Sequence, residues 1–121
     1  MGIWYTGSKV KTGKQYNMKR HLLIQQIKNT VYKIEPGAEI ILYGSRSRGD
    51  AVSESDWDLL ILVDGHLTDK RVDRIRHRLY EVEWDTGEVI SSIVRTRQEW
   101  DSRSYKAMPF HQRIEQEGIR L

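Results

Sequence analysis

The sequence predicts an α/β domain, because segments with the apolar spacing of helices alternate with short apolar runs typical of strands. The three expected strands cover residues 39–43, 59–63 and 88–94. A chain of 121 residues suits one domain with a single hydrophobic core. We therefore expect one domain over residues 18–121, preceded by a flexible extension over residues 1–17.

The first predicted helix begins at Met18, with Asn17 as its N-terminal cap, and apolar residues recur in it at about helical spacing. Pro36 and Gly37 end this helix. The strand over 39–43 follows. Because nearly all of its residues are apolar, we expect it to be covered on both faces.

The middle of the chain is predicted to hold a short helix opening at Ser45, the second strand and a longer helix. Trp57 separates two aspartates just before the second strand, so its side chain must face the opposite side of the sheet and belongs to the core. Thr68 is expected to cap the longer helix, which runs to about Trp84.

The C-terminal part follows the third strand. The segment 98–107 is polar, with Trp100 and Tyr105 as its expected packing anchors. A last helix is predicted, with Pro109 near its first turn and Gly118 as its stop.

Several charged or titratable side chains are expected at the surface. Arg71, Arg74 and Arg78 form a basic stripe on the longer helix, which we interpret as a solvated face paired with nearby acids. The alternative is a docking surface for an acidic partner. His111 is also expected to be exposed, and for Arg46 plain surface charge is the alternative to a position facing the phosphates.

The charge distribution argues against a general nucleic-acid binder. The net charge is +3 and the isoelectric point about 9.2, but residues 1–17 hold three lysines and no acidic residue. The remaining 17 basic residues therefore balance the 17 acidic residues. A neutral domain lacks the positive surface that nucleic-acid binding requires.

The composition also bears on location. The chain has no cysteine, so it has neither a disulfide framework nor a thiolate metal site. No apolar run approaches the roughly 18 residues of a membrane helix, and the N-terminus lacks the apolar segment of a secretory signal. We therefore expect a cytoplasmic protein without a membrane partner.

Candidate functional residues gather at the connection between the first two strands. Gly44 and Ser45 directly follow the first strand, and Asp56 and Asp58 open the second. Residues two apart on a strand point to the same face, so the two carboxylates repel each other unless a cation compensates. Mg²⁺ prefers such hard oxygen ligands. The glycine lets the backbone approach a ligand, and the serine offers a hydroxyl and an N–H to a phosphate.

Gly44-Ser45, ten further residues and the Asp56-x-Asp58 pair resemble the signature of the DNA polymerase β-like nucleotidyltransferase superfamily. The chain is similar to its short single-domain form, the minimal nucleotidyltransferases, over about residues 18–120. This resemblance implies a nucleotidyltransferase fold, in which a small mixed β-sheet is flanked by helices. It also implies two Mg²⁺ ions and a nucleoside triphosphate substrate, for which we expect ATP.

The resemblance assigns roles to these residues. Asp56 and Asp58 would act in catalysis and hold the metal ions, and Gly44 and Ser45 would bind the β- and γ-phosphates. Arg48, inside the same turn, is expected to contribute to phosphate binding, with plain surface charge as the alternative.

The resemblance further implies a third catalytic acid from a neighbouring strand, and here the sequence leaves alternatives open. Glu88, at the start of the expected third strand, is the first candidate for catalysis and metal binding. Asp85 is the second. Ser91 or Ser92 can instead occupy that position, which would leave two carboxylates in the site and slow turnover.

Minimal nucleotidyltransferases resemble half of a two-component system, because many are paired with a helical HEPN-type partner and some such pairs act as antitoxin and toxin. We therefore expect AMP transfer to an acceptor hydroxyl on a HEPN-type protein, in an antitoxin-like role. One alternative is a catalytically weak nucleotide-binding or regulatory subunit that acts by binding a partner protein. A nucleotide sensor and a homo-oligomer also stay open.

Overall fold

The computed structural model describes residues 13–49 and 55–121. Its elements in chain order are α1 (Gly13–Ile34), β2 (Glu39–Tyr43), α2 (Ser45–Arg48), β3 (Trp57–Val63), α3 (Asp69–Thr86), β4 (Ile90–Thr96), α4 (Arg97–Trp100), α5 (Arg103–Lys106), α6 (Pro109–Glu117) and β5 (Ile119–Arg120). The predicted alternation of helices and strands is confirmed. The short strand β5 was not predicted.

The four strands form one mixed sheet in the order β4-β3-β2-β5. β3 is parallel to β4 and antiparallel to β2, and β5 pairs with the other side of β2 in antiparallel orientation. The small mixed sheet flanked by helices is therefore confirmed. β2 has the predicted bounds, whereas β3 begins two residues earlier than predicted and β4 lies two residues later.

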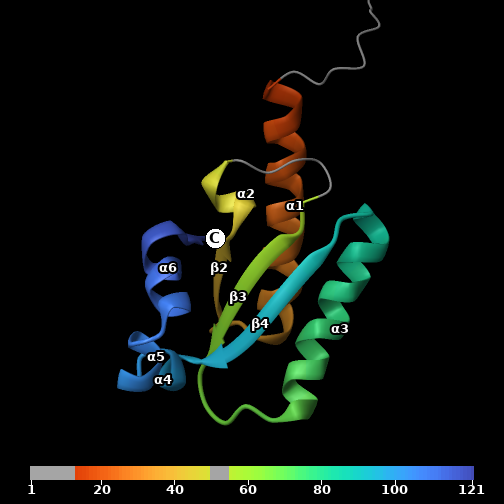
Figure 1. Ribbon diagram of the computed structural model, residues 1–121. Coiled ribbons are helices and arrows are strands. Elements are labelled where there is room, and N and C mark those ends of the chain that lie inside the picture. Colours follow the sequence, from red (N-terminus) through yellow and green to blue (C-terminus); the bar gives the residue numbers. More distant parts are fainter. Residues whose placement is uncertain (1–12, 50–54) are drawn as a thin grey trace, which may run out of the picture.

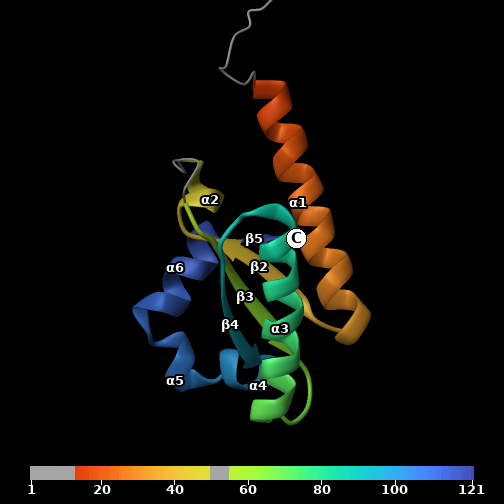
Figure 2. The ribbon, with the colours of Figure 1, turned by 90° about the vertical axis from the view of Figure 1, so that its right-hand side faces the viewer.

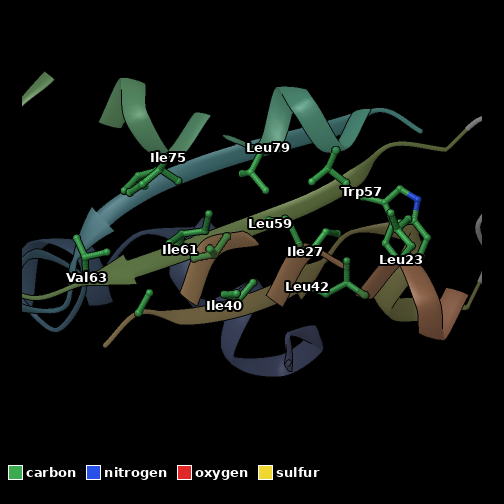
Figure 3. Close-up of a cluster of buried hydrophobic side chains, with 14 residues drawn as sticks. Leu23, Ile27, Ile40, Leu42, Trp57, Leu59, Ile61, Val63, Ile75 and Leu79 are labelled. Carbon is green, nitrogen blue, oxygen red and sulfur yellow. The ribbon is translucent and has the colours of Figure 1, made fainter. Parts of the chain in front are cut away.

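Helices cover both faces of the sheet (Figures 1 and 2). α1 and α3 pack on one face, where Leu23, Ile27 and Ile75 contribute to the larger hydrophobic cluster (Figure 3). The helices α4 to α6 cover the other face, where Trp100 and Ile114 belong to a second cluster. β2 is accordingly covered on both faces, as predicted.

The first helix starts earlier than predicted. α1 begins at Gly13, so Asn17 lies inside the helix and does not cap it. The physical reason is that residues 14–17 carry no helix breaker, whereas a potential cap does not by itself stop a helix from extending further. The part of the expected flexible extension over residues 1–12 lies outside the described residues.

The helix α3 is anchored to the end of α1. The hydroxyl of Thr68 accepts a hydrogen bond from the Arg71 backbone N–H, which confirms the predicted cap. The Arg71 guanidinium donates to both carboxylate oxygens of Glu35, at 2.7 and 2.8 Å, and to the carbonyls of Asp64 and His66. The prediction that Arg71 belongs to a solvated face is therefore wrong, because three segments converge on its side chain.

The C-terminal segment packs through aromatic rings. Trp100 is buried, and the ring of His111 stacks on it at a centroid distance of 4.3 Å. His111 is 6% exposed, so its predicted surface position is wrong. The predicted helix start at Pro109 and stop at Gly118 are confirmed.

None of the helices in the described ranges is long and apolar enough to cross a membrane.

Candidate active site

The turn between β2 and α2 depends on the backbone of Gly44. This glycine has φ 74° and ψ −156°, a conformation that residues with a side chain avoid. Its carbonyl accepts hydrogen bonds from the backbone N–H groups of Ser47 and Arg48 and from the Ser47 hydroxyl. The conformation redirects the chain from the buried strand into α2, so that Ser45 is the first residue of that helix.

Gly44 lies directly against the second aspartate. A Cβ atom at Gly44 would collide with the Oδ2 atom of Asp58, so only a glycine leaves room for this carboxylate. The strand pairing explains the approach, because Tyr43 is the partner of Asp58 in the antiparallel register of β2 and β3. The structure therefore brings the glycine-serine turn and Asp58 together.

The charge state of Asp58 depends on its burial and on Asp56. Burial raises the pKa of Asp58 above its ordinary value of 3.8, and the negative charge of Asp56 raises it further. Asp56 itself is exposed, just before β3. The ionised carboxylate pair is thus unfavourable in the ligand-free protein, and a bound cation would relieve it.

Arg48, the last residue of α2, also acts on Asp58. Its positive charge opposes the other two influences and lowers the pKa of Asp58. Its guanidinium also forms an ion pair with Glu117 of α6, with 3.2 Å between Nη1 and Oε1. Gly44 and the charge of Arg48 therefore both act on Asp58, and the ion pair joins α2 to α6, which lie beside each other in Figure 1.

Glu88 is held elsewhere. Its Oε1 atom accepts a hydrogen bond of 2.9 Å from the Trp57 indole N–H and lies 3.5 Å from Nη2 of Arg46. Trp57 is 2% exposed within the cluster of α1 and α3, as predicted, and neighbouring strand residues face opposite sides. The structure does not bring the Glu88 carboxylate together with Asp56 and Asp58.

Plain surface charge, one of the two interpretations of Arg46, is wrong because the residue is buried. Its side chain is 4% exposed, and its guanidinium carbon lies 4.6 Å from the centroid of the Trp57 ring. No local pattern could have revealed this burial, because α2 contains four residues with two arginines and shows no apolar periodicity. The one indirect signal was Trp57, because the face of an aromatic ring attracts a cation such as a guanidinium.

The nucleotidyltransferase domain family matches residues 24–119, which is most of the chain. This protein belongs to the nucleotidyltransferase domain family. The family lies within the DNA polymerase β-like superfamily, so the predicted resemblance is confirmed. No curated protein matches the sequence.

Two solved structures share the fold of this nucleotidyltransferase domain. One is described as the crystal structure of a toxin-antitoxin with AMP-PNP. Its sequence is 18% identical, the match covers 79% of this chain and 69% of the other chain, and the TM-score is 0.56. The other is described as a minimal nucleotidyltransferase. Its sequence is 17% identical, the match covers 94% of this chain and 100% of the other chain, and the TM-score is 0.52. At these identities the likeness concerns the fold alone.

The position beside Asp58 on β4 belongs to a serine. Ser91 is the partner of Asp58 in the parallel register of β3 and β4, so the two residues share one face of the sheet. Ser92 faces the other side. Within residues 13–49 and 55–121, no three histidine, cysteine or acidic side chains come together as a metal site.

The nucleotidyltransferase family generally uses a divalent metal and a nucleoside triphosphate. The residues present fit one such ion, because the mutual repulsion of Asp56 and Asp58 is the kind that a hard divalent cation relieves. Among the described residues, no third carboxylate joins the pair as the two-ion arrangement was expected to require.

Proposed function

We propose that this nucleotidyltransferase domain transfers AMP from Mg²⁺-bound ATP to a hydroxyl group of a protein partner. The contact between Gly44 and Asp58 carries the proposal, because it sets the glycine-serine turn against a carboxylate whose negative charge is disfavoured by burial and by Asp56. Family membership supports the reaction class. The structural likeness to a toxin-antitoxin bound to AMP-PNP supports an adenine nucleotide and a protein partner.

Different residues bind the metal ion and the phosphates. In this proposal Asp56 and Asp58 hold the Mg²⁺ ion, which supplies charge neutralisation to the triphosphate. Gly44 and Ser45 bind the terminal phosphates through backbone N–H groups and the serine hydroxyl. Arg48 adds positive charge beside Asp58 and the phosphates. The acceptor oxygen forms a bond with the α-phosphorus, the bond to the β-phosphate bridging oxygen breaks, pyrophosphate leaves, and the hydroxyl proton passes to solvent.

The acceptor is proposed to be a helical HEPN-type protein, in an antitoxin-like pairing. Two considerations support this choice, namely the structural likeness to a toxin-antitoxin and the pairing that the resemblance to minimal nucleotidyltransferases implies. The neutral charge balance of residues 18–121 favours a protein acceptor over a nucleic acid.

The decisive experiment uses ATP labelled at the α-phosphorus and, separately, at the γ-phosphorus. Compared with the lysate alone, adding the protein with Mg²⁺ should increase transfer of the α-label to protein and leave the γ-label unchanged, because the γ-phosphate leaves within pyrophosphate. Asp56→Asn should abolish labelling, whereas Asp73→Asn, an exposed aspartate on α3, should not. Wild-type labelling by Asp56→Asn would end the proposed mechanism.

A second candidate function is a regulatory subunit that binds nucleotide and partner with little turnover. Two observations favour it, namely the engagement of Glu88 by Trp57 and Arg46 and the serine beside Asp58. This candidate predicts Mg²⁺-dependent ATP binding by calorimetry without covalent transfer of the α-label. Binding together with transfer would exclude it.

A further inference from the structure

We propose that Arg46 is a positioning residue that couples Mg²⁺ binding to nucleotide binding, by locking the phosphate-binding turn onto the strand end that carries the aspartates. The inference rests on the proposed function and adds a residue that touches neither substrate nor metal.

Arg46 closes the ten-residue connection between the two halves of the motif. The connection runs from residue 46 to residue 55, between Ser45 and Asp56. Its first residue binds its last, because Nη2 and Nε of Arg46 donate to the Ser55 carbonyl at 2.9 and 3.3 Å. A direct contact between the first and the last residue of the connection therefore fixes the distance between the turn and Asp56.

The same guanidinium also holds the residue between the two aspartates. It lies over the Trp57 ring at 4.6 Å, a distance at which a cation and an aromatic face attract each other. Trp57 faces away from Asp58, so Arg46 supports the carboxylate pair from the reverse side of the strand. A shift of Arg46 would move both aspartates relative to Ser45.

Glu88 completes the arrangement. One carboxylate oxygen of Glu88 binds the Trp57 indole N–H and faces Arg46, so it compensates the buried positive charge. Arg20 of α1 donates to the Arg46 carbonyl at 3.4 Å and adds a contact from the first helix. Four segments of the chain thus meet at this residue: α1, α2, the start of β3 and the segment that leads into β4.

This arrangement has a thermodynamic consequence. Phosphate binding at the turn and Mg²⁺ binding at the aspartates increase each other's affinity only if the distance between the two sites matches the metal-bound triphosphate. A rigid link therefore produces favourable coupling between the two ligands, and a flexible link reduces it. Residues that merely stabilise the fold would not change this coupling.

The test measures ATP affinity by calorimetry with Mg²⁺ and with EDTA, in the full chain. The ratio of the two affinities should be about tenfold or more in the wild type. Arg46→Lys keeps the charge but cannot donate two parallel hydrogen bonds, and it should reduce the ratio to about threefold or less. Arg78→Lys, an exposed change on α3, is the control and should leave the ratio unchanged.

A second variant keeps the inference falsifiable should Arg46→Lys fail to fold. Glu88→Gln retains a hydrogen-bond acceptor for Trp57 and removes the charge that faces Arg46, and it should also lower the ratio. A folded Arg46→Lys or Glu88→Gln protein with the full wild-type ratio and a lowered melting temperature would overturn the positioning role. A wild-type protein without Mg²⁺-enhanced ATP binding would instead overturn the proposed function itself.

Discussion

Gly44 and Asp58 approach each other so closely that a single methyl group on the glycine would collide with the aspartate carboxylate. The two residues are fourteen positions apart in the sequence and meet because β2 and β3 pair in antiparallel register. The turn that is predicted to bind phosphate and the acid that is predicted to bind metal are thus parts of one corner. Substitutions in this corner and in its surroundings can measure what each part contributes.

Gly44→Ala should both destabilise the protein and remove nucleotide binding. The backbone conformation of Gly44 costs a residue with a side chain about 1–3 kcal/mol, and the added methyl group displaces Asp58. Urea unfolding and calorimetry with Mg²⁺-ATP would measure the two effects. Gly37→Ala is the matched control, because nothing lies within 4 Å of a Cβ at that glycine. Retained wild-type ATP affinity in Gly44→Ala would contradict the role of the corner.

Asp58→Asn should stabilise the ligand-free protein and abolish its stabilisation by Mg²⁺-ATP. Folding raises the pKa of Asp58 above the ordinary value of 3.8 that it has in the unfolded chain, so ionisation of Asp58 favours the unfolded chain. The free energy of unfolding therefore decreases as pH rises from the unfolded pKa to the folded pKa. An uncharged amide removes this penalty at neutral pH. Thermal unfolding with and without Mg²⁺-ATP measures both effects, and Asp73→Asn should show neither. A lowered melting temperature of ligand-free Asp58→Asn would show that the negative charge stabilises the fold.

Ser91→Asp should strengthen divalent-metal binding. Ser91 stands beside Asp58 on the same face, so an aspartate there adds a third carboxylate to the pair. We expect Mg²⁺ affinity to rise on the order of tenfold, because additional charged ligands tighten binding of hard cations. Calorimetry in the absence of nucleotide provides the measurement.

Ser92→Asp is the control for this change, since it adds the same charge to the same strand but on the opposite face. Equal metal affinity in both variants would mean that the face of the sheet does not matter, and the assignment of the metal position would fail.

Glu35→Gln should destabilise the protein at neutral pH and have no effect in acid. The hydrogen bonds from Arg71 are the main reason that the pKa of Glu35 lies below its ordinary value of 4.5. Its stabilising contribution is therefore present above 4.5 and lost as pH falls through the lowered value. We expect a loss of about 1–3 kcal/mol at neutral pH, measured by urea unfolding across the acid range.

The exposed pair of Arg78 and Glu81 provides the comparison for Glu35. Glu81→Gln should change stability by no more than about 1 kcal/mol, because solvent screens exposed pairs. A constant difference between wild type and Glu35→Gln at every pH would show that the carboxylate charge is not the cause.

Local sequence patterns predicted the main strands, the candidate site residues between them and the orientation of Trp57. The apolar runs placed the three main strands to within two residues, because burial of a strand requires apolar side chains whatever its neighbours are. The spacing of Gly44, Ser45, Asp56 and Asp58 was visible in the sequence and agreed with the family match. The opposite orientation of Trp57 followed from the alternation of side chains along a strand.

Other features depend on contacts between distant segments. Arg46, Arg71 and His111 all carry polar side chains that a single sequence assigns to the surface, yet each is enclosed or bound by residues from other elements. Arg46 and His111 are buried and Arg71 is half-buried because other residues satisfy or cover their side chains, and these residues include partners 11, 36 and 42 positions away.

The sequence by itself determined that two acids and a glycine-serine turn occur between two buried strands of a nucleotidyltransferase domain. Only the tertiary structure decided between Glu88 and Ser91 as the neighbour of Asp58. The side-chain period of a strand is two residues, so a shift of one position in the pairing of β3 with β4 would exchange the two faces. That pairing is set by the packing of the whole sheet, and it directs Ser91 toward Asp58 and Glu88 toward Trp57.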